Sequence, residues 1–277
     1  MNLWFTELYE NDSGFAVKIK ETLFSGKSEY QKLDILQTEQ LGKMMVLDGL
    51  VMLTEANEFS YHEMIAHVPL IAHPNPERVL VIGGGDGGTA REVLKHEIVK
   101  ECVMVEIDEL VVEKSKEFFP EIASAFDNPK LNLIIDDGFK YIEDNKNAFD
   151  VIIIDSTDPI GPAEPLFSSR FYKNVNECLK TDGIMSAQSE SPYLYKKIIK
   201  LMYANIKSAF PIVKMYTGFV PFYPTGMWSF AFGSKKYTYQ EKPRIEDIDK
   251  LENLNYFNRK IYYSAFDLPN FAKDLVK

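Results

Sequence analysis

The feature that most constrains the fold of this chain is a series of five short apolar runs between residues 78 and 187. Charged segments long enough to form helices separate these runs. Strands that alternate with helices build a parallel, doubly wound sheet, so the sequence predicts that architecture here. The runs are residues 78–82, 102–105, 131–135, 151–154 and 183–187.

Two further apolar segments, 213–216 and 227–232, lie close together in the sequence. Because a short connection joins antiparallel neighbours, we expect these segments to pair at the edge of the sheet. Such an ending is typical of the methyltransferase version of the Rossmann architecture. We therefore predict an α/β fold, with a Rossmann-like, methyltransferase-type sheet over residues 57–277 that carries the chemistry.

The first 56 residues have a different pattern. Phe15, Val17 and Ile19 alternate with other residues at the period of a half-buried strand. Asp48 and Gly49 separate two apolar runs, and this pair favours a tight hairpin because glycine accepts a positive φ. We therefore predict a small β-strand and hairpin domain over residues 1–56.

Composition narrows the class of function. The formal net charge of the chain is −10, which argues against nucleic-acid binding and suits a polycationic substrate, although acidity also serves solubility. No apolar run approaches the ~20 residues that span a membrane, and the N-terminus lacks a signal pattern. Cys102 and Cys178 are expected to be free thiols in the cytoplasm. The scattered histidines and cysteines predict no metal site.

A glycine-rich loop, residues 83–88, follows the first strand of the predicted sheet and opens a helix. Glycines let the backbone turn sharply and approach a ligand. Glu106 lies at the end of the next strand, where a carboxylate accepts hydrogen bonds from ribose hydroxyls. We therefore predict a nucleoside site that includes Gly83, Gly85, Glu106 and Ile107. The alternative is a structural turn with an incidental acid.

Two aspartates refine this nucleoside site. Asp86 lies in the glycine loop, where a carboxylate would repel a pyrophosphate, so a cationic sulfonium nucleoside fits better than a dinucleotide. Asp137 and Gly138 follow the third strand, where a carboxylate can accept from the adenine amine. Asp137 is also a candidate helix N-cap, and the two roles are compatible.

Asp155 and Asp158 follow the fourth strand. Open α/β sheets bind ligands at the carboxyl ends of their strands, so these acids join Asp86 and Asp137 at one rim. Clustered carboxylates repel one another unless a cation enters, which predicts a cation site. The prolines between residues 159 and 165 predict a stiff loop that could close over the ligand.

Taken together, these motifs resemble those of the spermidine synthases, the polyamine aminopropyltransferases. The resemblance covers essentially the whole chain. The glycine block 83–88 and the Asp-Ser-Thr-Asp-Pro block 155–159 carry it most specifically. Further matching segments are residues 28–31, 47–49, 58–64, 105–108, 137–138, 149–163, 221–226 and 268–271.

The resemblance implies decarboxylated S-adenosylmethionine as donor and putrescine as acceptor, with spermidine and methylthioadenosine as products. It also implies a homodimer or homotetramer and no cofactor. Asp155, Asp158 and Tyr61 would be catalytic. Donor-binding residues would be Gln31, Gly83, Gly85, Asp86, Glu106, Ile107, Asp137, Gly138 and Pro162. Acceptor-binding residues would be His62, Asp86, Asp155, Asp158 and Tyr223, with Trp4, Glu190 and Trp228 as weaker candidates.

In this interpretation Asp155 takes a proton from the acceptor amine, Tyr61 orients Asp155 by a hydrogen bond, and the free amine attacks the methylene next to sulfur. One rival is an amine N-methyltransferase that uses ordinary S-adenosylmethionine, whose carboxylate Asp86 should repel. The other rival is a non-catalytic polyamine or nucleoside sensor. The sequence leaves open putrescine, agmatine, cadaverine or a longer amine as acceptor, and dimer or tetramer as assembly.

Overall fold

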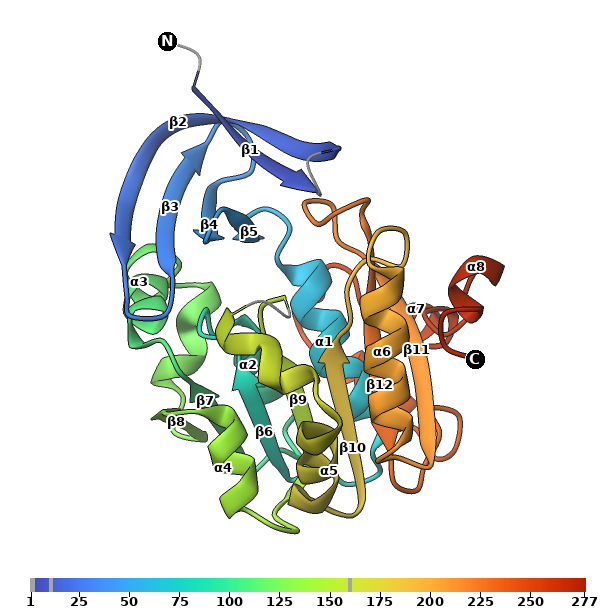
Figure 1. The fold of residues 1–277 in the computed structure, drawn as a ribbon. Coiled ribbons are helices and arrows are strands. Elements are labelled where there is room, and N and C mark those ends of the chain that lie inside the picture. Colours follow the sequence, from blue (N-terminus) through green and yellow to red (C-terminus); the bar gives the residue numbers. More distant parts are fainter. Residues whose placement is uncertain (1–2, 10–11, 159–160) are drawn as a thin grey trace.

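The computed structural model, which describes residues 3–9, 12–158 and 161–277, contains a small N-terminal sheet and a larger sheet flanked by helices (Figure 1). The small sheet lies beyond the carboxyl ends of the parallel strands of the larger one, at the top of the view. Its strands follow the order β1-β2-β3-β4-β5 and are antiparallel. They are β1 (Leu3–Tyr9), β2 (Ser13–Lys27), β3 (Lys32–Thr38), β4 (Lys43–Leu47) and β5 (Leu50–Thr54).

The predicted hairpin is confirmed. Asp48 and Gly49 connect β4 to β5 with φ values of 47° and 89°. A two-residue turn with positive φ at both central positions matches the right-handed twist of the flanking strands. The hairpin directs β5 back toward the larger sheet, so that residues 50–52 come to line the cavity described below.

The larger sheet has the order β11-β12-β10-β9-β6-β7-β8. β12 is antiparallel to both of its neighbours, and the other pairs are parallel, which confirms the predicted doubly wound sheet with an antiparallel edge. Its strands are β6 (Arg78–Gly83), β7 (Glu101–Glu106), β8 (Leu131–Ile135), β9 (Phe149–Asp155), β10 (Leu179–Gln188), β11 (Ile212–Phe219) and β12 (Met227–Ser234).

The strand order reverses between β6 and β9. At such a switch point the connections leave on opposite faces of the sheet, which opens a crevice at the carboxyl ends of the strands. The glycine loop after β6 and the acids at the end of β9 therefore meet in this crevice. The carboxyl end of β7, which pairs with β6 and carries Glu106, borders this crevice.

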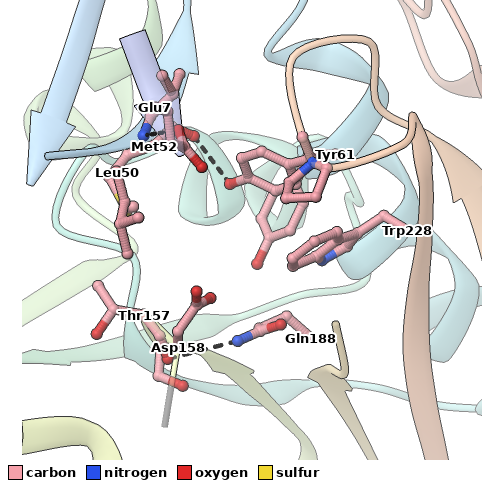
Figure 2. Close-up of a pocket in the computed structure, with 12 residues that line it drawn as sticks. Glu7, Leu50, Met52, Tyr61, Thr157, Asp158, Gln188 and Trp228 are labelled. Atoms are coloured by element: carbon pink, nitrogen blue, oxygen red, sulfur yellow. Dashed lines mark hydrogen bonds between the residues drawn. The ribbon is translucent and has the colours of Figure 1, made fainter. Parts of the chain in front are cut away.

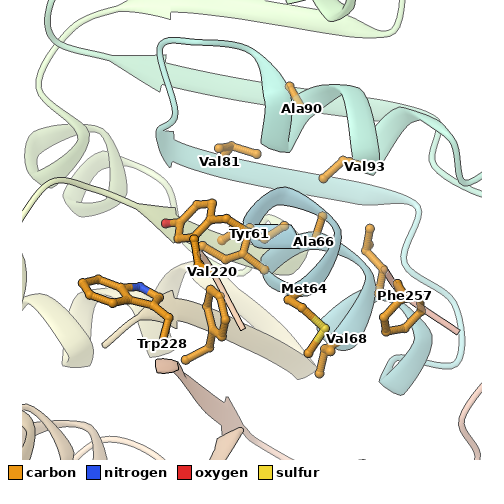
Figure 3. Close-up of a cluster of buried hydrophobic side chains, with 14 of the residues drawn as sticks. Tyr61, Met64, Ala66, Val68, Val81, Ala90, Val93, Val220, Trp228 and Phe257 are labelled. Atoms are coloured by element: carbon orange, nitrogen blue, oxygen red, sulfur yellow. The ribbon is translucent and has the colours of Figure 1, made fainter. Parts of the chain in front are cut away.

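Helices pack on both faces of the larger sheet. Side chains alternate along β6, so Val79 and Val81 belong to one buried cluster and Leu80 and Ile82 to another. Figure 3 shows the first cluster, which includes side chains of α1, α2 and β6. The helices are α1 (Phe59–Ala72), α2 (Gly88–Leu94), α3 (Glu109–Phe118), α4 (Gly138–Asp144), α5 (Ser169–Cys178), α6 (Lys196–Lys207), α7 (Arg259–Ser264) and α8 (Asn270–Lys273), with 3-10 helices η1 (Ile122–Asp127), η2 (Gly161–Phe167) and η3 (Ile245–Lys250).

Within the described part of the chain, no helix is long and apolar enough to cross a membrane. α1 is instead buried over nearly its whole length by protein, from Ser60 to Ala72. It carries several polar side chains whose partners come from other segments. Those partners fix where the helix sits relative to the crevice.

One of these polar side chains is Glu63, which is 1% exposed. Its carboxylate accepts hydrogen bonds from the backbone N–H groups of Asn255, Tyr256 and Phe257, at 2.8, 2.9 and 2.6 Å. These bonds attach the C-terminal segment to α1. A buried carboxylate with three donors stabilises the fold only as long as both of its oxygens can accept hydrogen bonds.

We expect Glu63→Gln to lower the free energy of unfolding by about 2 kcal/mol, because the new amide group faces N–H donors and leaves them unpaired. Urea unfolding measures this change. Glu39→Gln is the matched control, since Glu39 forms an ion pair with Lys18 in which both side chains are 42% exposed and should change stability by less than about 0.5 kcal/mol. Equal losses in the two variants would contradict the assignment.

Candidate active site

A cavity of about 360 Å³ lies between the small sheet and the carboxyl ends of β6, β7 and β9. A second cavity of about 30 Å³ adjoins it and shares Leu50, Met52, Tyr61, Asp158 and Tyr223 with it. We call them the large cavity and the small cavity. Most of the residues predicted from the sequence to form the site line the large cavity: Gln31, Tyr61, His62, Gly83, Gly85, Asp86, Glu106, Ile107, Asp137, Gly138, Asp155, Asp158 and Tyr223.

The glycine loop is shaped by its contact with β9. Gly83 and Gly84 have φ values of 80° and 73°. A Cβ atom on Gly83 would lie 2.2 Å from the carbonyl oxygen of Asp155, and one on Gly84 would lie 2.8 Å from the Asp155 carboxylate. Both the backbone angles and the close approach therefore require glycine.

Glu106 at the end of β7 faces the same loop. Its carboxylate accepts a hydrogen bond of 2.9 Å from the N–H of Asp108. A Cβ on Gly85 would lie 3.0 Å from one Glu106 oxygen, so the loop and the acid are in contact. Burial raises the pKa of Glu106 to about 7, which the hydrogen bond from Asp108 partly opposes. This side chain is well placed to accept from a ligand hydroxyl.

Gln31 and Asp137 also line the large cavity. Gln31 donates to Asp108 at 2.8 Å, and Asp108 in turn caps the N-terminus of α3. Asp137 caps α4 by accepting from the N–H of Phe139 at 2.8 Å. The capping role that the sequence suggested for Asp137 is therefore present. The bond uses one carboxylate oxygen, and the side chain also lines the cavity.

Asp155 lines the large cavity and is hydrogen-bonded to Tyr61, which lines both cavities. The hydroxyl of Tyr61 donates to its Oδ1 at 2.6 Å, as predicted, and the hydroxyl of Thr89 donates to its Oδ2 at 2.6 Å. Burial, and then the Asp86 carboxylate, raise the pKa of Asp155 above its ordinary value. Asp155 is thus a fixed carboxylate whose basicity is increased. Thr89 was not predicted, although its place at the start of the helix after the glycine loop could have indicated it.

Asp86 occupies the turn of the glycine loop. Its Oδ1 accepts from the N–H of Gly88 at 2.6 Å and lies 3.3 Å from Nε2 of His62. Within the described residues, the other oxygen, Oδ2, has no such hydrogen bond or ion pair, and the Asp86 carboxylate lines the large cavity. Asp86 can therefore accept a hydrogen bond from a ligand ammonium.

The small cavity contains an acid that the sequence analysis did not identify (Figure 2). Glu7 on β1 accepts from the N–H of Val51 at 2.8 Å, and burial raises its pKa to about 7. Trp4, the residue proposed from this segment, is 56% exposed and does not line either cavity. Because side chains alternate along a strand, residues 4 and 7 point to opposite faces of β1.

Asp158, Gln188 and Trp228 form the other side of the small cavity. The side-chain amide of Gln188 donates to the carbonyl of Thr157. The Trp228 ring lies 4.5 Å from that of Tyr223, and its buried Nε1 has no hydrogen-bond partner among the described residues. Gln188 was also missed, although it is the last residue of β10 at the same strand-end rim as the predicted acids.

Glu190 contacts Asp158 and is 1% exposed. Neither of its oxygens has a donor among the described groups, so a hydrogen bond between the two carboxyls requires a shared proton. Burial, and then the Asp158 carboxylate, raise the pKa of Glu190 well above its ordinary value. Burial also raises the pKa of Asp158. Two carboxyls that share one proton keep one negative charge, which a bound cation would stabilise.

The side chain of Pro162 lies outside the described residues, as do Pro159 and Ile160 of the same loop. Among the described residues, neither cavity is lined by lysine or arginine. Carboxylates instead line both, from Asp86 through Asp155 and Asp158 to Glu7. A nucleoside-sized space that continues into a narrow acidic one fits a ligand pair with several positive charges.

Comparison with known proteins agrees with this geometry. Residues 58–243 match the family model described as the spermine/spermidine synthase domain, and residues 3–55 match the spermidine synthase tetramerisation domain. The polyamine aminopropyltransferase of Caldicellulosiruptor saccharolyticus is 50% identical over 279 residues, which cover 100% of this chain and 99% of that protein. The protein of the same name from Thermoanaerobacter pseudethanolicus is 50% identical, with 99% of each chain covered.

Solved structures give the same result. A spermidine synthase crystallised with the transition-state analogue AdoDATO superimposes with a TM-score of 0.97 and 43% identity, covering 99% of this chain and 94% of that one. The spermidine synthase of Thermotoga maritima superimposes with a TM-score of 0.93 and 42% identity, with the same coverage.

Proposed function

Because this chain belongs to the spermidine synthase family and is a polyamine aminopropyltransferase, we propose that it transfers the aminopropyl group of decarboxylated S-adenosylmethionine to putrescine. The observation that carries the choice of substrates is the continuity of the two cavities. The large one has the size and lining for a nucleoside, and the small one is a narrow acidic extension. Asp155 lines the large cavity next to Tyr61, which the two cavities share.

The donor is assigned to the large cavity. Glu106 would accept from the ribose hydroxyls, and Asp137 from the adenine amine through the oxygen that does not cap α4. Asp86 would accept from the terminal ammonium of the aminopropyl group. These contacts would place the methylene next to the sulfonium near Asp155, because the glycine loop is in contact with the end of β9.

The acceptor diamine is assigned to the small cavity. Its distant ammonium would lie between Glu7 and Asp158, and its methylene chain would contact the rings of Tyr223 and Trp228. An ammonium on Asp158 would offset the negative charge that Asp158 shares with the buried Glu190, which supports this placement. The near amine would lie beside Asp155.

In the chemical step, Asp155 accepts a proton from the near ammonium of the acceptor. The free amine then attacks the methylene next to sulfur, a C–N bond forms as the C–S bond breaks, and methylthioadenosine leaves with the electron pair. An alkylammonium has a pKa of ~10.4, so transfer to an ordinary carboxylate is uphill. The raised pKa of Asp155 reduces that difference.

We further propose that the reaction needs no metal or redox cofactor, because a sulfonium is already an activated leaving group. The match of residues 3–55 to a tetramerisation domain indicates an oligomer, and we propose a homotetramer or homodimer. A cytoplasmic location is supported by the two buried free thiols, Cys102 and Cys178.

Glu106 should serve donor binding rather than the chemical step. At pH 8 we expect Glu106→Gln to raise the donor KM about tenfold and leave kcat within about threefold, since a hydrogen bond to a charged acceptor is worth roughly 1.5 kcal/mol or more. Because the pKa of Glu106 is about 7, the carboxylate is largely protonated at pH 6, and the ratio of KM values should be smaller there. Steady-state kinetics at both pH values test this. A collapse of kcat with an unchanged donor KM would contradict the assignment.

The proposed function is tested by incubating the protein with decarboxylated S-adenosylmethionine and a panel of amines, with products identified by mass spectrometry. The expected products are spermidine and methylthioadenosine, with putrescine used most efficiently. Agmatine, cadaverine and a triamine are the comparison acceptors. Methylated amine and S-adenosylhomocysteine from the ordinary donor would instead identify an N-methyltransferase, and binding without turnover would identify a sensor.

A further inference from the structure

The imidazole of His62 lies between two carboxylates. Its Nδ1 is 2.5 Å from Oε2 of Glu58, and its Nε2 is 3.3 Å from Oδ1 of Asp86. A neutral imidazole has one N–H group, so in either tautomer a nitrogen lone pair would face a carboxylate oxygen. The doubly protonated ring donates to both. The geometry therefore requires an imidazolium.

The ring is held in this orientation by packing. The His62 side chain is 3% exposed, and a Cβ atom on Gly88 would lie 2.4 Å from ring atoms. The imidazole thus occupies space at the start of α2 that is open because Gly88 has no side chain. The rings of Tyr61 and His62 form a T-shaped pair with a centroid distance of 5.4 Å.

Glu58 is itself held by a cation from the second helix. Nη2 of Arg91 lies 3.0 Å from Oε1 and 2.9 Å from Oε2 of Glu58, and Nε of Arg91 donates to Glu92 at 2.8 Å. The Glu58 and Arg91 side chains are 9% and 18% exposed, so solvent screens this contact weakly. Glu58 is therefore an ordered, ionised partner for His62 that makes no contact with either cavity.

The charge of His62 matters because of Asp155. The Asp86 carboxylate raises the pKa of Asp155, and the His62 cation lowers it. Two neighbouring carboxylates share a proton more readily when no cation is close. If His62 lost its charge, Asp155 would take up a proton at higher pH, and a protonated carboxyl cannot accept the proton of the acceptor amine.

We propose that Glu58 is a positioning residue, which holds His62 as an imidazolium and thereby keeps Asp155 ionised beside Asp86. Glu58 acts through His62 and does not touch substrate. The effect on catalysis rests on the proposed role of Asp155 as base. The titratable or charged groups that face His62, or act on it through Glu58, are Glu58 and Tyr61 on its own helix, Asp86 from the glycine loop, Arg91 from α2 and Asp155 from β9.

The test uses Glu58→Gln in the full-length protein. ¹⁵N NMR of labelled histidine, with His62 assigned through a His62→Asn variant, should show two protonated ring nitrogens in the wild type at pH 8 and a neutral tautomer in Glu58→Gln. The acidic limb of the pH profile of kcat/KM should move upward by about one unit. On that limb kcat/KM would fall about tenfold, and activity should recover at higher pH because Asp155 then ionises again.

Glu92→Gln is the matched control. Glu92 is 1% exposed and bonds to the same Arg91, but its histidine partner is His67 and not His62. Glu92→Gln should lose as much stability as Glu58→Gln but leave the acidic limb of the pH profile in place. Glu58→Asp should keep the imidazolium signal of His62. A neutral His62 in the wild type, or an equal shift of the limb in Glu92→Gln, would overturn the proposal. The NMR result does not depend on activity. It therefore distinguishes a failure of the Glu58–His62 proposal from a failure of the proposed reaction.

Discussion

Asp155→Asn is expected to lower kcat by on the order of 10²–10⁴-fold, the usual contribution of a positioned general base. The amide keeps the size of the side chain, and its oxygen can still accept from the Tyr61 hydroxyl. It cannot take a proton from the acceptor ammonium. Single-turnover rates with saturating donor and putrescine would measure this step directly, free of product release.

The same substitution should not destabilise the fold at pH 8. Burial raises the pKa of Asp155 in the folded protein above its unfolded value. The stability that this group contributes is therefore present at low pH and is lost as pH rises through the folded pKa. An uncharged asparagine avoids that loss, so the thermal midpoint of the variant at pH 8 should equal or exceed that of the wild type.

Asp150→Asn is the matched control, since it makes the same change at the other end of β9. Asp150 is 5% exposed, accepts from the N–H groups of Glu77 and Arg78, and pairs with Lys180. This variant should lose stability and keep kcat. A kcat for Asp155→Asn within threefold of the wild type would exclude Asp155 as the base.

The sequence predicted the acids of the nucleoside site because topology alone brings them together. Parallel strands place their carboxyl ends at one rim, so Asp86, Glu106, Asp137 and Asp155 meet whatever the details of packing. The Asp48-Gly49 hairpin was equally accessible, since two positive φ values admit few sequences. Local rules and sheet topology were enough in both cases.

The acceptor side was predicted less completely because it depends on how separate segments pack. Glu7 enters the small cavity only because β1 of the small sheet lies over the larger sheet, which no local pattern specifies. Glu190 has a φ of 67°, and its carbonyl oxygen accepts from the N–H and the hydroxyl of Ser229. The backbone there is fixed by a partner 39 residues away. Contacts of this kind follow from the fold and not from the motif.

Donor choice is where the two catalytic interpretations of the sequence make opposite predictions. S-adenosylmethionine differs from its decarboxylated form by one carboxylate next to the terminal amine, the end assigned to Asp86. Two like charges 4 Å apart at an effective dielectric of about 20 repel by ~4 kcal/mol. The His62 imidazolium beside Asp86 offsets part of this repulsion. With screening, we expect about a 100-fold preference for the decarboxylated donor, or ~2.7 kcal/mol.

Asp86→Asn should reduce this preference to less than about tenfold, because it weakens binding of the ammonium of one donor and removes the repulsion of the other. Titration calorimetry with both donors on both proteins measures the ratio of the Kd values. Asp137→Asn is the matched control, since Asp137 lines the cavity at the end assigned to adenine, which the two donors share. It should weaken both donors equally and leave the ratio unchanged. Equal binding of the two donors by the wild type would refute the charge argument and favour a methyl donor instead.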